Sequence, residues 1–438
     1  MDVLNFLVYQ VLTNQTIFIG LIALAGLLLQ RKALPHVIDG VVKTVIGLII
    51  LSSGAGIIFS SLSQVVTALN ASMGVAGTLP INDAAGAMVL SLEGYGRNAV
   101  LIFLFAFLLH LVLVRLVPGK DFKNVYLTAH LALFHACFMA VTLPVVLGTT
   151  NDVVIIAVAT VLNAAYYTFS PAITRKLSRE WTKDAITLGF MDQVGSLVAH
   201  FVGKFVGDPK EDADKLKLPK WASMFRDNTV VLFFLIPIIF VGMGLAVGQE
   251  GIQALAGTGP DATNWIIWLI IQGWTFTAGI VILLQGVRMF VGSIVPAFKG
   301  ISDKFLPGAV PALDAPTFFP YSPMGGMFGF LGSSVGAILV CLLTIICHAP
   351  VIVFPSPIIM YFDGNVMGVF GNKAGGWKGA IAAGFVTGAI TSAAAILFYP
   401  ITGAMFGSGV TWSNIDYALV WMPAMYILKF LRGLILGF

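Results

Sequence analysis

Long apolar segments follow one another along almost the whole chain, separated by short polar stretches. A helix needs about 20 predominantly apolar residues to cross the hydrocarbon core of a bilayer, and these segments are of that length. Their apolar residues run continuously and do not alternate with polar ones, which predicts helices rather than the strands of a membrane barrel. We therefore expect an all-α polytopic membrane protein with about eleven transmembrane helices. The predicted spans are residues 11–30, 37–62, 98–117, 127–148, 153–171, 229–248, 265–290, 329–348, 351–370, 379–399 and 417–436.

Two further apolar segments, residues 81–92 and 310–318, are too short to span a bilayer. Each overlaps a stretch of the form Gly-x-(Leu/Val)-Pro-x-x-Asp-Ala, found at residues 77–84 and again at residues 308–315. Proline favours the start of a helix, and short Pro-containing segments at corresponding places in two halves of a chain are typical of transporter binding sites. We therefore expect two re-entrant hairpin segments, each carrying one aspartate.

The segments before these two stretches also match each other. The run from Gly40 to Lys43 resembles the run from Gly286 to Arg288. The sequence thus predicts one membrane-embedded domain, residues 1–438, made of two duplicated, inverted-repeat-like halves. The halves are residues 1–171 and 229–438, joined by a connecting region at residues 172–228.

The most polar part of the chain, residues 175–227, is rich in Lys and Arg and also carries several acids. Loops rich in Lys and Arg stay on the cytoplasmic side of a membrane, so we expect a cytoplasmic loop here. Its least polar part, residues 185–207, is expected to be half-buried.

Composition agrees with a membrane protein. Of 438 residues, 58% are hydrophobic and only 10% are charged, and the mean hydropathy is +0.95. A soluble protein carries about 25% charged residues. The net charge of +4 is small and no basic cluster is interleaved with aromatic residues, so we expect no nucleic-acid partner.

The chain lacks the motifs of several enzyme classes. It contains no Gly-x-x-x-x-Gly-Lys-Ser/Thr motif, so we do not expect it to hydrolyse nucleotides. Its three cysteines lie in apolar runs and none has metal-ligand spacing, so we expect no metal and no cofactor. An ion gradient or a partner protein would have to supply the energy for any transport.

Ionisable side chains inside apolar segments are costly unless they are paired or hydrated, which makes them functional candidates. Asp83 and Asp314 have two interpretations. They could accept hydrogen bonds from a polyhydroxylated solute near the middle of the membrane, or they could be N-caps of short helices. The two interpretations are compatible, because the N-terminal end of a helix also binds ligands.

His130 is a candidate for solute binding because a neutral imidazole can both donate and accept a hydrogen bond. The alternative is a structural hydrogen bond to a carbonyl of a neighbouring helix. Asp363 and Asn365 could line a path for the solute.

Several runs of residues together point to a known family. They are Gln285 to Val291, Ala297-Phe298-x-Gly300-Ile301-Ser302, Pro307 to Val310 and Asp314, with further matches at Ile46-Gly47, Leu127 to His130, Ala140 to Leu143, Leu216 to Trp221 and Gly375 to Trp377. With these residues the chain resembles the ascorbate-type enzyme IIC family of the bacterial phosphoenolpyruvate-dependent sugar phosphotransferase system. The resemblance extends over nearly the whole length.

The resemblance implies an inner-membrane homodimer surrounded by lipid, with eleven helices per subunit arranged as a core domain and a V-shaped scaffold domain. The protein would bind a small sugar acid or polyol and carry it inward. A separate enzyme IIB, which receives its phosphate from enzyme IIA, would then phosphorylate the solute. No residue of this chain is expected to be phosphorylated itself.

The resemblance also implies a pocket with contributions from four places in the chain. The implied substrate-binding residues are Asp83, Ala84, Ala85, His130, Phe134, Phe190, Met191, Asp192, Gln193 and Asp314. Asp314 and His130 match the family, and the helix face from His130 reaches Phe134. Ascorbate members carry Thr-Tyr at the place of Ala84 and Ala85. A Gly-His-Gln-Gln run of the family falls on residues 189–192, where Asp192 and Gln193 substitute if the register shifts.

The sequence leaves three functional classes open. The first is a phosphotransferase-system permease for ascorbate or a related sugar acid or polyol. In it, Asp314 would accept the proton that a solute hydroxyl loses on phosphorylation or would orient the solute. The second is a gradient-driven secondary transporter that uses Asp83 and Asp314 as ion or proton sites. The third is a receptor or sensor that does not transport.

Overall fold

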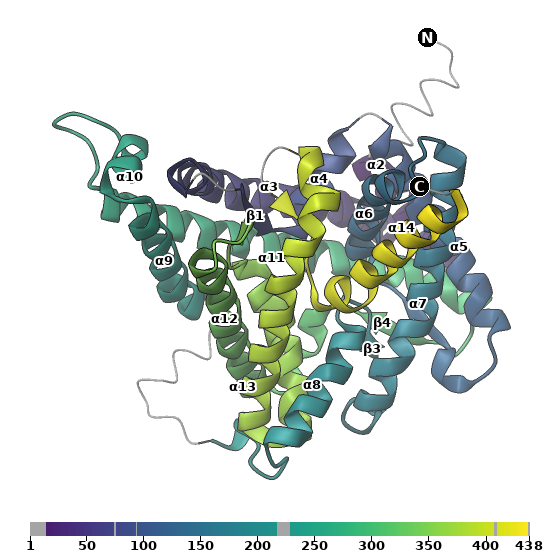
Figure 1. The fold of residues 1–438 in the computed structure, drawn as a ribbon. Helices are drawn as coiled ribbons and strands as arrows, with labels where there is room; N and C mark the ends of the chain where they lie inside the picture. The colour runs from purple at the N-terminus through teal and green to yellow at the C-terminus, as the bar shows by residue number, and fades with distance from the viewer. Residues whose placement is uncertain (1–14, 74–75, 93, 217–227, 407–409, 437–438) are drawn as a thin grey trace.

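The computed structural model describes residues 15–73, 76–92, 94–216, 228–406 and 410–436. This part of the chain is mostly helical, which confirms a polytopic α-helical membrane protein (Figure 1). The helices are α2 (Gln15–Leu29), α3 (Leu34–Met73), α4 (Asn82–Ser91), α5 (Tyr95–Leu116), α6 (Ala129–Leu147), α7 (Asp152–Thr182), α8 (Gln193–Val206), α9 (Asn228–Val247), α10 (Gln249–Ala256), α11 (Trp265–Phe305), α12 (Pro323–Ile346), α13 (Pro357–Phe406) and α14 (Met422–Leu436). In these ranges seven helices are long and apolar enough to cross a membrane, or eight if the bent pair α9 and α10 forms one span. The larger number of spans expected from the sequence stays a prediction.

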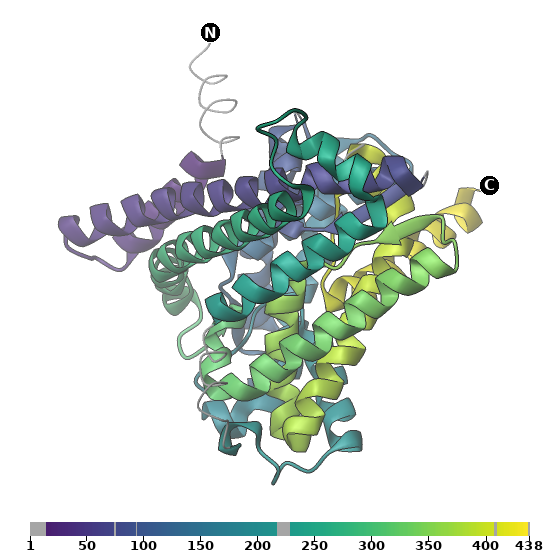
Figure 2. The same cartoon turned by 90° about the vertical axis from the view of Figure 1, so that its left-hand side faces the viewer.

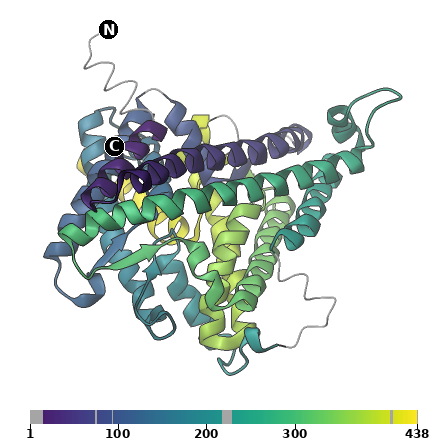
Figure 3. The ribbon, with the colours of Figure 1, turned by 180° about the vertical axis from the view of Figure 1, so that it is seen from behind.

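Two long helices, α3 and α11, lie side by side and antiparallel across the molecule (Figure 2 and Figure 3). Glycines seven residues apart make their close contact possible. A Cβ atom on Gly47 would lie 2.5 Å from the backbone nitrogen of Phe290, and one on Gly54 would lie 2.5 Å from that of Leu283. Small residues at such crossings let the backbones of membrane helices approach each other closely.

Six short strands occur in the described chain, which the expectation of an all-α fold did not include. They are β1 (Ala76–Pro80), β2 (Asn124–Tyr126), β3 (Thr187–Leu188), β4 (Val310–Leu313), β5 (Val351–Val353) and β6 (Val410–Thr411). They form two parallel sheets with the orders β5-β1-β6 and β2-β4-β3. The two Pro-containing stretches therefore form the central strands, and each central strand pairs only with strands from outside its own sequence half. The duplication itself stays a prediction.

The two expected re-entrant helices form only in part. After β1 the chain forms the short helix α4, which begins at Asn82. After β4 it forms two 3-10 turns, Ala315–Thr317 and Phe319–Tyr321, so the expectation of a helix over the second segment is wrong. Pro316 and Pro320 explain the difference, because each removes an amide donor and clashes with the preceding turn of an α-helix.

The polar region that the sequence predicts as a loop begins with helix, because α7 continues to Thr182. Arg175 is buried there and donates to the carboxylate of Asp184 at 2.7 and 2.8 Å and to the carbonyl of Lys120 at 2.6 Å. Beyond β3, helix α8 packs against α13. These contacts explain why a charged segment folds back onto the helices.

Helix α13 is broken in the middle, at Gly375 and Gly376, where the sequence predicts a loop. Gly376 has a φ of +64°, in the left-handed region that favours glycine. A Cβ atom on Gly371 would lie 2.6 Å from the carbonyl oxygen of Gly379, so the chain turns back on itself here. The two parts of α13 thus form a helical hairpin beside α12 and α8.

Candidate functional site

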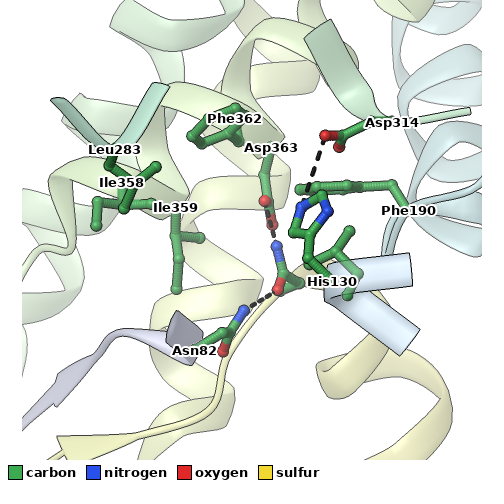
Figure 4. A pocket seen from close by; sticks show the side chains of 11 residues that line it. Asn82, His130, Phe190, Leu283, Asp314, Ile358, Ile359, Phe362 and Asp363 are labelled. Atoms are coloured by element: carbon green, nitrogen blue, oxygen red, sulfur yellow. Dashed lines mark hydrogen bonds and ion pairs between the residues drawn. The ribbon is translucent and has the colours of Figure 1, made fainter. Parts of the chain in front are cut away.

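A small cavity lies where the chain leaves the two sheets (Figure 4). Its lining residues are Asn82, His130, Leu131, Phe190, Leu283, Asp314, Ile358, Ile359, Phe362, Asp363 and Asn414. Most of them follow the carboxyl end of one of the six strands by a few residues. In parallel sheets this edge is where ligands bind, because side chains from several strands converge there. The cavity volume is about 30 Å³, which holds about two water molecules.

His130 and Asp314 face each other across this cavity (Figure 4). His130 lies on the first turn of α6 and Asp314 directly follows β4. The distance from His130 Nε2 to Asp314 Oδ2 is 3.6 Å, beyond hydrogen-bonding range. His130 Nδ1 has no hydrogen-bond partner among the described residues, although the side chain is buried. A third group in the cavity could therefore bond to His130 Nδ1.

Asp314 also has a structural role. Its Oδ1 accepts a hydrogen bond of 2.8 Å from the backbone nitrogen of Ala315 and caps the first 3-10 turn. The N-cap interpretation is therefore confirmed for Asp314. It is wrong for Asp83, because the N-cap residue of α4 is Ile81. The side chains of Asp83 and Ala84 lie outside the described part of the structure.

A chain of amide and carboxyl groups forms the opposite wall of the cavity. Asn82 exchanges two hydrogen bonds of 2.9 Å with the backbone of Ser413 and also donates to Asn414. Asn414 in turn donates to Asp363 Oδ1 at 2.5 Å, and the backbone nitrogen of Ile415 donates to Asp363 Oδ2 at 3.2 Å. These bonds join the start of α4, helix α13 and the segment after β6 into one wall.

Asp192 and Gln193 lie behind this wall and do not line the cavity. Asp192 is fully buried beside Asp363. The Tyr166 hydroxyl lies 2.8 Å from Gln193 Oε1 and 2.5 Å from Asp416 Oδ2. It has one proton, which it donates to Asp416, the nearer acceptor.

Of the remaining predicted residues, Phe190 lines the cavity, and its ring lies 6.2 Å from that of Phe362. Phe134 packs edge-on against His130, at 6.3 Å between ring centroids, and does not line the cavity. Ala85 and Met191 are fully buried and do not line it either. The structure therefore brings His130, Phe190 and Asp314 together and leaves the other described candidates in supporting positions.

Sequence reasoning missed Asn82 and Asn414, although it included Asp363 as a residue on a solute path. Asn82 directly precedes Asp83 in a stretch that had already drawn attention. Asn414 belongs to the polar run Ser413-Asn414-Ile415-Asp416, which interrupts two apolar segments near the C-terminal end of the sequence. A polar run between two apolar segments is the sequence signal that could have identified Asn414 as a site residue.

Comparison with known proteins now adds to this geometry. The family described as "PTS system sugar-specific permease component" matches residues 10–416. The chain belongs to this permease family. It is also similar to the "Ascorbate-specific PTS system EIIC component" of Mycoplasma pneumoniae, with 26% identity over 414 residues. That alignment covers 84% of this chain and 62% of the Mycoplasma protein, so the chain spans less than two thirds of the length of this relative. The resemblance to an enzyme IIC permease, expected from the sequence, is confirmed.

Proposed function

We propose that this permease carries ascorbate, another sugar acid or a polyol across the bacterial inner membrane and presents it to a separate enzyme IIB for phosphorylation. The observation that carries the proposal is the cavity lined by His130 and Asp314, enclosed by apolar helices of a phosphotransferase-system permease. A sugar-like solute needs several hydrogen-bonding groups in a site that excludes bulk water, and this cavity supplies them.

A hydroxyl group fits between a carboxylate and an imidazole because it donates one hydrogen bond and accepts two. In the proposed complex, a solute hydroxyl donates to Asp314 Oδ2 and accepts from His130. The rings of Phe190 and Phe362 pack against the apolar face of the solute, which presents its C–H groups. The amides of Asn82 and Asn414 offer further donors and acceptors on the opposite wall.

The cavity has to open to admit a solute, because its volume is about 30 Å³. A cavity of this volume holds only about two water molecules. Its walls come from two groups of elements. One group comprises α6, which carries His130, and β4, which is followed directly by Asp314. The other group comprises α13, which carries Asp363. Separation of these groups as rigid bodies would enlarge the cavity and expose it to one side, as in transporters with paired interrupted segments.

Asp314 is also the candidate proton acceptor in the phosphorylation step. A solute hydroxyl has to lose its proton as it attacks the phosphoryl group carried by enzyme IIB, and a carboxylate within hydrogen-bonding distance can take it. One oxygen of Asp314 caps a turn, and the other faces the cavity and His130. In the proposed step this second oxygen takes the proton while the first keeps the turn in place.

The contact with enzyme IIB is proposed to use residues 175–227. This region carries much of the charge of the chain, and its helix α8 packs against the hairpin of α13 at one end of the molecule (Figure 1). A double charge reversal at Lys210 and Lys215 should weaken coupling to enzyme IIB without changing solute binding. Unchanged phosphorylation by enzyme IIB in that variant would argue against this contact.

Uptake into vesicles tests the proposed function against gradient-driven transport. Vesicles containing the permease, supplied with enzyme IIA, enzyme IIB and phosphoenolpyruvate, should accumulate phosphorylated ascorbate or polyol. A protonophore that collapses the membrane gradient should leave this accumulation unchanged. Accumulation of unmodified solute that needs the gradient, and not phosphoenolpyruvate, would favour a secondary transporter instead.

A further inference from the structure

Three buried carboxyl groups lie close together beside the cavity, on Asp192, Asp363 and Asp416. Their hydrogen-bond partners differ sharply. Asp416 accepts from the Tyr166 hydroxyl at 2.5 Å and from two backbone nitrogens at the start of α8, at 2.8 and 3.0 Å. Helix N-termini stabilise negative charge, so Asp416 has the surroundings of an ionised carboxylate.

Asp363 has fewer donors and Asp192 has none. Asp363 accepts from Asn414 and from the backbone of Ile415. Neither oxygen of Asp192 meets a hydrogen-bond donor in the part of the chain that the structure describes, although the side chain is completely buried. An unpaired buried carboxylate is very costly, so the Asp192 carboxyl needs a partner that a fixed donor does not supply.

Among the side chains that the structure describes, no Lys or Arg neutralises these acids. Arg175 is the only one of them that is buried, and it pairs with Asp184. Nor do the described residues place three or more His, Cys, Asp or Glu side chains so that they could hold a metal ion. Burial raises the pKa of Asp192 well above its ordinary value, and the neighbouring carboxyls of Asp363 and Asp416 raise it further.

We propose that Asp192 and Asp363 share one proton and together form a second hydrogen-bonding site for the solute, with Asp363 contacting a solute hydroxyl and Asp192 holding the proton behind it. Two neighbouring carboxyls in a low-dielectric interior cannot both ionise, and one proton between them removes the repulsion. Asp363 lines the cavity, and Asp192 neighbours Asp363 without lining the cavity itself. That this hydroxyl belongs to the transported solute rests on the proposed function.

This carboxyl pair makes solute binding dependent on its proton. The titratable groups around the pair are Asp416 before α14, Tyr166 on α7, and His130 and Asp314 on the other side of the same cavity. With one proton, the pair can donate and accept at once, as a hydroxyl-binding site requires. When the proton is lost at high pH, the two negative charges repel and the hydroxyl site is disrupted.

Infrared spectroscopy of the full-length protein in lipid tests the shared proton without any solute. The wild-type protein at neutral pH should show the C=O stretch of a protonated carboxylic acid. The double variant Asp192→Asn with Asp363→Asn should remove this band, and each single variant should shift it, since both carboxyls contact the same proton. Asp261→Asn, at an exposed acid, is the matched control and should keep the band unshifted. Absence of the band in the wild type, or an unchanged band in the double variant, would overturn the proposal.

Binding of ascorbate, xylitol and mannitol, measured by thermal shift at neutral and at alkaline pH, tests the solute contact. For a probe that stabilises the wild type, affinity should fall about tenfold as the pair loses its proton. In Asp192→Asn the affinity should be lower at neutral pH and should no longer change with pH. An unchanged affinity in this variant at both pH values would rule out the pair as a solute site. If the infrared band behaves as expected and none of the probes binds the wild type, the proposed function fails and the shared proton stands.

Discussion

His130 and Asp314 come from segments far apart in the sequence, yet each is held in place by its own local structure. Asp314 is fixed by the turn that it caps, and His130 is fixed by its place in the first turn of α6. The two rings of Phe134 and Phe290 pack edge-on against the imidazole, at 6.3 and 6.1 Å between centroids. The residues are therefore positioned before a solute arrives, which lowers the entropy cost of binding it.

Asp314→Asn should separate binding from folding. An asparagine side chain still caps the turn, so the unfolding temperature should stay close to that of the wild type. The lost charge should weaken solute binding about ten- to hundredfold, because a hydrogen bond to a charged group contributes about 1.5–3 kcal/mol. Titration calorimetry and phosphoenolpyruvate-dependent phosphorylation would measure both effects. Full uptake and phosphorylation in the variant would show that Asp314 has neither role.

Sequence reasoning found the residues whose position depends on local motifs and missed those that depend on long-range pairing. Asp314 and His130 could be recognised from a Pro-containing stretch and a family match. Asn82 and Asn414 meet only because the strands before them, β1 and β6, pair across most of the chain. A single sequence carries no signal for such pairing, since each of the two strands is only a few residues long.

At the scale of elements, the contact between α3 and α11 depends on glycine. A Cβ atom on Gly47 would lie 2.5 Å from a backbone nitrogen of α11, and a backbone atom cannot yield as the end of a side chain can. Gly47→Ala should therefore destabilise the protein by about 1–3 kcal/mol, as overpacking typically does. Gly56, on the same helix, has open space around its Cβ position. Gly56→Ala is the control and should be neutral or slightly stabilising in the same thermal unfolding assay, because Ala favours a helix more than Gly does. Equal loss of stability in both variants would show that the close contact with α11 is not the cause.

The end of α7 is tied to its surroundings by ion pairs that depend on pH. The hydrogen bond from Arg175 is the largest cause that lowers the pKa of Asp184, and Arg179 does the same for the pKa of Asp121. An acid with a lowered pKa in the folded state stabilises the fold above its unfolded pKa of about 3.9. This contribution is lost as the pH falls through the folded pKa.

Asp184→Asn should accordingly lower the stability at neutral pH by about 1 kcal/mol, a modest value because the carboxylate is partly exposed and screened. The difference from the wild type should shrink and vanish as the pH falls through the lowered pKa of Asp184. Unfolding curves at several pH values, with Asp261→Asn as the control, would measure it. A difference that stays constant down to acidic pH would mean that packing, and not charge, is what the substitution removes.

At the scale of the whole molecule, the two halves of the sequence are interlocked. Each Pro-containing strand completes its sheet with strands from outside its own half, and the carboxyl ends of both sheets meet at one cavity. The sequence predicted the membrane class and the importance of both Pro-containing stretches. It did not predict the strands, because segments of two to five residues cannot be distinguished from loops without knowledge of their partners. The homodimer and the two-domain arrangement expected from the family resemblance stay predictions.

Direct binding of a solute to the purified permease tests most sharply whether the cavity is a solute site. Ascorbate, pentitols, hexitols and sugar acids would be screened by thermal shift, since a ligand at 100 times its Kd adds about 2.7 kcal/mol to the stability of the form it binds. We expect one of these solutes to raise the unfolding temperature of the wild type and of Asp261→Asn. The same solute should have little effect on the double variant His130→Leu with Asp314→Asn. Equal stabilisation of the double variant, or no stabilisation of the wild type by any of these solutes, would contradict a solute site between His130 and Asp314.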